Sequence, residues 1–155
     1  MSPEKDIPGV WVPPPLIYLA GFAIGLVLDL LRPVPVLPQA VQYSAGFALI
    51  AIGFAIAALG FREFVRVKTP FDPYQPTQDV ITSGPFRYSR NPLYLSLATL
   101  YSGTAIAIDG IWIVAMLVPT LIVLHYGVIL AEEAYLERKF PDTYLPYKAR
   151  VRRWF

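Results

Sequence analysis

Residues 82–94 place a guanidinium group beside the start of a predicted helix. The segment reads Thr-Ser-Gly-Pro-Phe-Arg-Tyr-Ser-Arg-Asn-Pro-Leu-Tyr, and an apolar run follows Asn91 and Pro92. Asn is a favoured N-cap and Pro is favoured at the first helical position, so this pair predicts a helix start. The unpaired N–H groups of that start, together with the Arg90 side chain, could bind a carboxylate. The structural alternative is a capped helix start with an arginine at the membrane interface.

A second group of polar residues begins at Glu132 and Glu133, at the end of another apolar run. Adjacent carboxylates are disfavoured at a helix C-terminus, so we expect this helix to continue to Pro141. Such carboxylates could accept a proton from an amine, although ordinary interfacial charges are the alternative. After Pro141, residues 144, 147 and 151 fall on one helical face. By itself this pattern describes an amphipathic helix on an anionic membrane surface.

Several kinds of site are excluded by what the chain lacks. It contains no Cys and one His, which removes disulfides, thiol nucleophiles and Cys/His metal sites, so we expect no metal. A glycine-rich nucleotide loop after a strand and a P-loop are both absent. The net charge of +2 gives no case for a nucleic-acid partner.

The elements that must position these residues are apolar. The chain has 155 residues, of which 55% are hydrophobic and 15% are charged, so we expect one domain that is not a water-soluble monomer. Four apolar runs are each about long enough to cross a bilayer core of roughly 30 Å. They span residues 13–31, 41–61, 92–108 and 111–131. The prediction is an all-α integral membrane protein with about four transmembrane helices and a cytoplasmic C-terminal helical tail.

Small residues recur within the first two runs. Gly21 and Gly25 are four residues apart, and Gly46, Gly53 and Gly60 repeat every seven residues. A stripe of small residues lets helices pack closely in lipid, where hydrophobicity provides no attraction between them. We therefore predict helix packing at these glycines. A groove for the tail of a ligand is the functional alternative.

The distribution of basic residues predicts the orientation. All of the 13 Lys and Arg residues except Arg32 lie in the N-terminus, at Lys5, in residues 62–91 or in the C-terminal tail. With four spans these regions share one face, and short cytoplasmic loops are enriched in basic residues. We expect an integral membrane protein, in the inner membrane of a prokaryote, with both termini and the active site facing the cytoplasm.

Taken together, the two polar segments resemble the isoprenylcysteine carboxyl methyltransferase and phospholipid methyltransferase superfamily of integral membrane enzymes. Residues 84–94 are similar to its G-P-[FY]-x-x-x-R-[HN]-P-x-Y signature, and residues 132–147 to its E-E-x-x-L-x-x-x-[FY]-x-x-x-Y-x-x-Y tail. Thr69-Pro70 ahead of the first block also fits. The motifs occur in the expected order with a helical hairpin between them, and the resemblance covers roughly the C-terminal 90 residues.

This resemblance implies that S-adenosylmethionine binds without a Rossmann fold, in a pocket formed by the last two spans and the tail, and leaves as S-adenosylhomocysteine. Residues 1–61 would then be N-terminal spans, and residues 62–155 the cofactor-binding core of the single domain. Asn91 stands where many relatives have His, so acid–base catalysis there is not expected. The residues expected to bind the cofactor are Tyr88, Arg90, Asn91, Pro92, Tyr94, Glu132, Glu133, Tyr144 and Tyr147.

The implied reaction transfers a methyl group to a small lipophilic or lipid acceptor delivered from the membrane. A carboxylate acceptor, as in isoprenylcysteine-like O-methylation, is placed first, because a sulfonium and a carboxylate combine into neutral products when water is excluded. Arg153 could orient such an acid, so Arg90, Glu133 and Arg153 are the expected catalytic residues. The alternatives are N-methylation of a phospholipid or another amine, and a non-catalytic membrane adaptor with an amphipathic tail.

Overall fold

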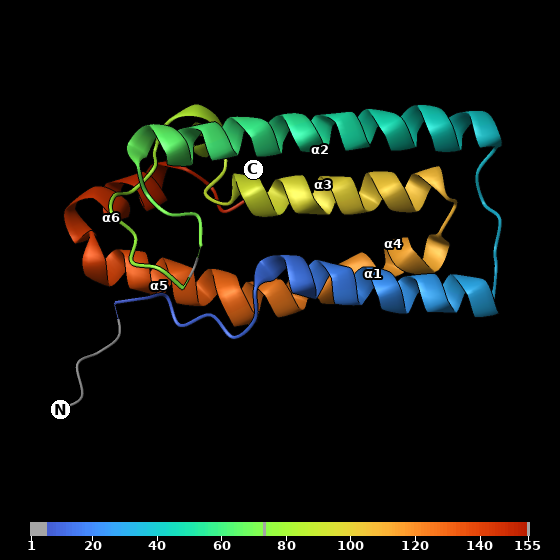
Figure 1. Cartoon of the computed structure of the whole chain (residues 1–155), viewed down its shortest axis with the longest axis horizontal. Coiled ribbons are helices and arrows are strands. Elements are labelled where there is room, and N and C mark those ends of the chain that lie inside the picture. The colour runs from blue at the N-terminus through green and yellow to red at the C-terminus, as the bar shows by residue number, and fades with distance from the viewer. Residues whose placement is uncertain (1–5, 73, 155) are drawn as a thin grey trace.

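The protein is a bundle of long helices, described by a computed structural model for residues 6–72 and 74–154. Figure 1 shows α1, α2, α3 and α4 side by side, with α5 and α6 gathered at one end. α3 packs along α2, and α4 packs along α1. The elements are α1 (Pro14–Leu31), α2 (Gln39–Val67), the 3₁₀ turn η1 (Gly84–Arg87), α3 (Pro92–Ala107), α4 (Ile111–Leu124), the π-helical turn η2 (His125–Ile129), α5 (Leu130–Lys139) and α6 (Pro141–Arg150).

The all-helical prediction is confirmed for the described residues, which contain no strand. Three helices are long and apolar enough to cross a membrane: Pro14–Leu31, Gln39–Val67 and the continuous helix Ile111–Lys139. The third predicted span, α3, has 16 residues, about 24 Å at 1.5 Å per residue, which is shorter than a typical hydrocarbon core. That four helices cross the membrane therefore remains a prediction.

The glycine repeat of α2 fits the side chains of α3. A Cβ atom built on Gly46, Gly53 or Gly60 would lie 2.7, 2.7 or 2.6 Å from the nearest atom of, in order, Ala107, Leu100 and Leu93. The partners on α3 also repeat every seven residues, in the opposite chain direction. The packing prediction is confirmed, because these glycines bring the two helices into close contact.

α1 and α4 are joined by a close approach and by a charged side chain. A Cβ atom on Gly25 would lie 2.5 Å from the Cα of Ile113, so the two backbones nearly touch. The carboxylate of Asp29 accepts hydrogen bonds from the backbone N–H groups of Trp112 (3.3 Å) and Ile113 (3.1 Å). These are unpaired donors of the first turn of α4, so Asp29 caps that helix from a neighbouring one.

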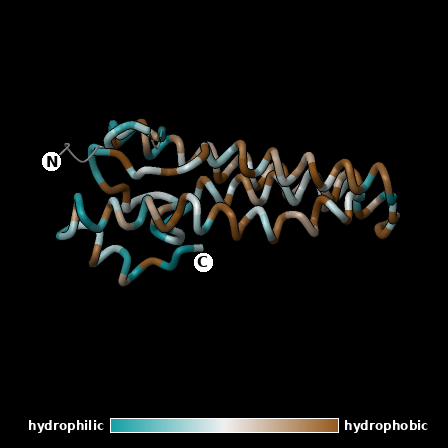
Figure 2. Tube along the Cα trace, turned by 90° about the horizontal axis from the view of Figure 1, so that it is seen from below, coloured by the Kyte–Doolittle hydropathy of each residue, from teal (hydrophilic) through white to brown (hydrophobic). Residues whose placement is uncertain are grey.

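Polar residues gather at one end of the bundle, as Figure 2 shows. The N-terminal stretch, the connection between α2 and α3, and the α5–α6 region all lie at this end (Figure 1). Arg32 follows α1 at the opposite end. The predicted grouping of basic segments is confirmed for the described residues, while Lys5 lies outside them.

We expect Gly46→Val to weaken the contact between α2 and α3. The added side chain meets backbone atoms of Ala107, which cannot rotate away, and such overpacking destabilises a fold by about 1–3 kcal/mol. Denaturant titration of the protein in detergent micelles measures this loss. Ala48→Val is the matched control, because Ala48 lies on the exposed side of the same helix. Equal stability of the two variants would contradict the packing role.

Candidate functional site

The two adjacent carboxylates are presented by an irregular turn in a continuous helix. Between α4 and α5, residues His125–Ile129 form a π-helical turn. Such a turn accommodates an extra residue and changes the direction in which later side chains project. The helix then continues through Glu132 and Glu133 to Lys139, as expected. Glu133 is buried and Glu132 is partly buried, and nothing in the local sequence pattern predicts the irregular turn.

Glu133 binds two arginines from distant parts of the chain. Arg153 donates from Nε to Oε1 and from Nη2 to Oε2, each at 2.8 Å. The Nη1 atom of Arg90 lies 3.3 Å from Oε1, and the side chains of Arg90 and Glu133 are only 9% and 7% exposed. The structure therefore brings together all three expected catalytic residues. Bidentate pairing at this distance is the strong form of a carboxylate–guanidinium contact.

The C-terminal tail is also held by hydrogen bonds from residues 89–91, directly before α3. The N–H group of Arg90 donates to the carbonyl of Arg152 at 3.0 Å. The Ser89 hydroxyl and the Asn91 side-chain amide both donate to the carbonyl of Arg153, each at 3.2 Å. Asn91 occupies the N-cap position of α3, as predicted, but its side chain makes no capping bond. Its role as a side-chain cap was wrong, because the amide binds the tail instead.

The aromatic residues of α6 face the protein. Tyr144 and Tyr147 are 2% and 3% exposed and pack with Val80. The Tyr147 hydroxyl donates to the carbonyl of Phe86 at 2.8 Å. Burial raises the pKa of Tyr144 to about 12 and also raises that of Tyr147, so both remain neutral donors at physiological pH. This face of α6 therefore packs against the protein, whereas the alternative interpretation placed it on a membrane surface.

Glu132 has a different environment from its neighbour. Its Oε1 accepts a hydrogen bond of 2.6 Å from the hydroxyl of Tyr94, which is the hydrogen-bond partner of its carboxylate within the described chain. The backbone carbonyl of Tyr94 in turn accepts from the hydroxyl of Tyr18 at 2.8 Å. Tyr18 thus supports the site from α1, a contribution that no sequence motif indicates.

Residues from both motif segments line one cavity of about 1140 Å³. Of the residues expected at the site, the cavity wall contains Arg90, Asn91, Pro92, Tyr94, Glu132, Glu133, Tyr144 and Tyr147. The described wall does not include Tyr88, whose side chain is 78% exposed, or Arg153, which contacts Glu133 from behind the wall. Both side-chain hydrogen bonds of Arg153 are directed to the Glu133 carboxylate.

Sequence reasoning missed an apolar part of the same wall. It includes proline residues 13–15 and, from α2, Phe54, Ala57 and Phe61. The cavity wall therefore contains residues from both sides of the predicted boundary at residue 61, between the N-terminal spans and the cofactor-binding core. Apolar side chains in an apolar helix give no local signal, so only their position beside the polar residues identifies them.

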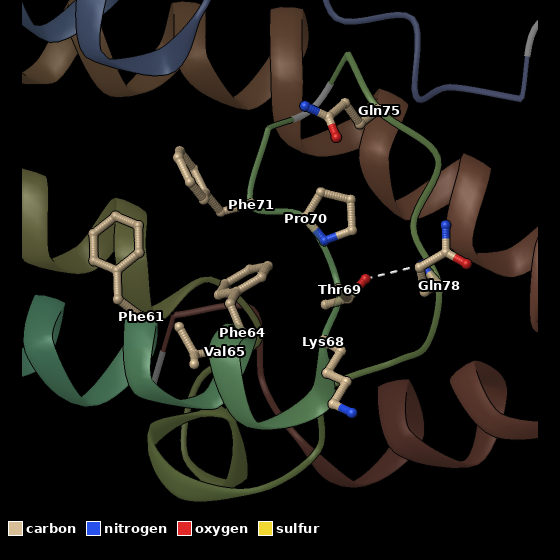
Figure 3. A pocket seen from close by; sticks show the side chains of 9 residues that line it. All are labelled: Phe61, Phe64, Val65, Lys68, Thr69, Pro70, Phe71, Gln75 and Gln78. Atoms are coloured by element: carbon tan, nitrogen blue, oxygen red, sulfur yellow. Dashed lines mark hydrogen bonds between the residues drawn. The ribbon is translucent and has the colours of Figure 1, made fainter.

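The connection after α2 contributes to two cavities. Figure 3 shows the smaller one, of about 540 Å³, which shares Phe61, Phe64 and Phe71 with the main cavity. Thr69 is buried, and its Oγ1 accepts a hydrogen bond of 2.9 Å from the N–H group of Gln78 (Figure 3). This bond closes the loop that follows Thr69-Pro70. Both of these residues belong to the main cavity wall.

One donor of the Arg90 side chain lacks an acceptor. Its Nε is buried, and no partner for it is found in the described chain. A buried unpaired donor costs about 1–3 kcal/mol. Among the described residues, no group of three or more His, Cys, Asp and Glu residues could hold a metal ion.

Comparisons with known proteins agree with the geometry. The model of the phospholipid methyltransferase family matches residues 41–143. An uncharacterized protein from Haemophilus influenzae is 40% identical over 68 residues, which cover 40% of this chain and 98% of that protein. No solved structure matches.

We expect Arg153→Leu to release the tail from the bundle. The substitution removes two charged hydrogen bonds from buried Glu133, each of which contributes about 1.5–3 kcal/mol. Limited proteolysis should then cut residues 141–154 faster while the bundle stays intact. Arg152→Leu is the matched control, because the Arg152 side chain is exposed and its carbonyl contact to Arg90 survives the change. Equal cleavage rates in the two variants would show that Arg153 does not hold the tail.

Proposed function

Since the chain belongs to the phospholipid methyltransferase family, in the integral membrane methyltransferase superfamily, we propose that it is an S-adenosylmethionine-dependent enzyme that methylates a lipophilic acceptor. One observation carries the proposal. The two motif segments bring Arg90 and Glu133, which are 43 residues apart in the chain, into contact at the wall of a single large cavity. An arginine that served only as an interfacial anchor would have no reason to be buried there.

The residues of the cavity fit the cofactor. S-adenosylmethionine carries a carboxylate, an ammonium and a sulfonium, so it needs partners of both signs. Arg90 belongs to the cavity wall, and its guanidinium group would hold the carboxylate. Glu132 and Glu133 would face the positive groups, and Asn91 and Tyr94 offer further polar atoms from the same wall.

When bound, the cofactor supplies an electrophilic methyl group on a positively charged sulfur. The chain's own contribution is to orient the reactants and exclude water. The buried rings of Tyr144 and Tyr147 cover the cavity on the side of the tail. Fixing two reactants in line is a large source of rate enhancement that requires no dedicated base.

The charges of the wall favour an amine acceptor over a carboxylate. Arg90 is the basic residue of the described wall, and it already contacts Glu133. The acidic residues of the wall are Asp72, Asp79, Glu132 and Glu133. An acidic lining would repel a carboxylate, whereas it attracts a protonated amine. This reverses the order in which the sequence placed the two acceptor classes.

Glu132 is the better candidate to accept the proton of an amine. Glu133 is held by two guanidinium groups, which stabilise its ionised form. Glu132 accepts a hydrogen bond from the neutral hydroxyl of Tyr94, at 2.6 Å. A proton acceptor must remain accessible to its donor, and Glu132 belongs to the cavity wall.

The apolar part of the wall suits the hydrocarbon portion of a lipid. Phe54 and Phe61 line the cavity and are 62% and 44% exposed. An apolar acceptor that enters from the bilayer would pass along these side chains. With the basic segments in the cytoplasm, the polar end would receive the cofactor from water.

S-adenosylhomocysteine should bind the purified protein in detergent, as measured by calorimetry. Arg90→Ala and Glu133→Ala should each weaken this binding at least about tenfold, or about 1.4 kcal/mol, because they remove polar groups of the cavity. Tyr88→Ala should leave the affinity unchanged, since Tyr88 is exposed outside the described wall. Failure of the folded wild-type protein to bind would refute the proposal.

The acceptor class can be read from the chemistry of the product. Membranes containing the protein should transfer label from methyl-labelled S-adenosylmethionine to extracted lipid, and Glu133→Ala membranes should not. After alkaline hydrolysis we expect the label to stay on non-volatile material, as for a methyl group on nitrogen. Release of the label as volatile methanol would instead identify a carboxyl ester and contradict the assignment of an amine.

A further inference from the structure

A buried carboxylate outside the cavity wall lies near the end of α2. Glu63 is 9% exposed and is the acidic residue of that helix. Its Oε2 accepts hydrogen bonds from the Nε (2.9 Å) and Nη2 (2.6 Å) atoms of Arg66. The hydroxyl of Ser83 donates to the same oxygen at 2.5 Å, and Arg66 also donates to the Ser83 hydroxyl. The carboxylate thus links α2 to Ser83, the residue directly before the 3₁₀ turn η1.

Gly84 explains why this turn has its particular sequence. Its φ of +56° lies in the left-handed region, which a residue with a Cβ atom rarely adopts. A Cβ atom on Gly84 would also lie 2.8 Å from Cγ and 2.9 Å from Oε1 of Glu63. Glycine is therefore required here both by the backbone conformation and by the closeness of the carboxylate.

The turn held by Glu63 carries groups that shape the site. Phe86 packs edge-on against Phe64 of α2, with ring centroids 5.7 Å apart. The carbonyl of Phe86 accepts a hydrogen bond from the hydroxyl of Tyr147, a residue of the cavity wall. The carbonyl of Pro85 accepts the N–H group of Ser89 at 3.2 Å, and Arg90 follows directly. Displacement of the turn would move both Tyr147 and Arg90.

We propose that Glu63 is a positioning residue for the cofactor site, a role that rests on the proposed function. It lies outside the described cavity wall and touches no bound group. It acts through Ser83 and Gly84, fixing the 3₁₀ turn so that the Tyr147 contact and the Arg90 side chain stay in place. Without the carboxylate, the Ser83 hydroxyl and the Arg66 guanidinium lose their common acceptor and the turn is released from α2.

Three variants test this role. Glu63→Ala removes the acceptor, whereas Glu63→Gln keeps an oxygen of similar position and should recover most of the wild-type behaviour. Glu137→Ala is the matched control: it removes a carboxylate at the same end of the bundle that is paired with Lys148 and is absent from the described wall. If Glu63→Ala fails to fold, Ser83→Ala removes one of the same hydrogen bonds with a smaller change.

Two measurements are made on each variant. Hydrogen exchange of the ligand-free protein reports on residues 84–91, and calorimetry reports the affinity for S-adenosylhomocysteine. We expect Glu63→Ala to accelerate exchange in residues 84–91 and to weaken binding at least about fivefold, with exchange in α1 and α4 unchanged. Glu63→Gln should restore both quantities, and Glu137→Ala should change neither.

Two results would overturn the positioning role. One is unchanged exchange at residues 84–91 in Glu63→Ala, which would show that the carboxylate does not hold the turn. The other is accelerated exchange with wild-type affinity, which would show that the turn does not position the site. If the wild-type protein itself does not bind S-adenosylhomocysteine, the proposed function fails, and the exchange data still decide whether Glu63 anchors the turn.

Discussion

The polar end of this protein depends on neutralising the buried carboxylate of Glu133. A charge removed from water is costly unless it is paired and hydrogen-bonded, so the fold must bring cations to it. Arg90 comes from the start of α3 and Arg153 from the last residues of the chain. One carboxylate therefore holds the segment before α3 and the C-terminal tail against α5. The cavity wall includes both Arg90 and Glu133.

The apolar part of the bundle complements this arrangement. Where Gly46, Gly53 and Gly60 line α2, this helix packs closely against α3. Phe54 and Phe61 lie on another side of α2 and line the cavity. A single helix thus contributes both to helix packing and to the cavity wall. Under the proposed function, such a site would receive a polar molecule from water and an apolar one from lipid.

Much of this structure could be predicted from residue types and spacing. The apolar runs predicted four helices close to those observed, because twenty or so apolar residues have no other stable form in lipid. The seven-residue glycine repeat predicted close packing. The resemblance of the two polar motifs to a known family implied eight residues that the cavity wall contains, including Arg90, Glu132 and Glu133.

Other features were decided only by tertiary structure. The binding of the Asn91 amide to the tail and the burial of Tyr144 and Tyr147 depend on contacts between residues far apart in the chain. Glu63 looks like one more interfacial charge until Gly84 is seen against it. Local pattern therefore indicated which helices form and which polar residues are candidates for a site. Only the folded chain decided which groups meet, because a partner 20 or more residues away leaves no trace in local spacing.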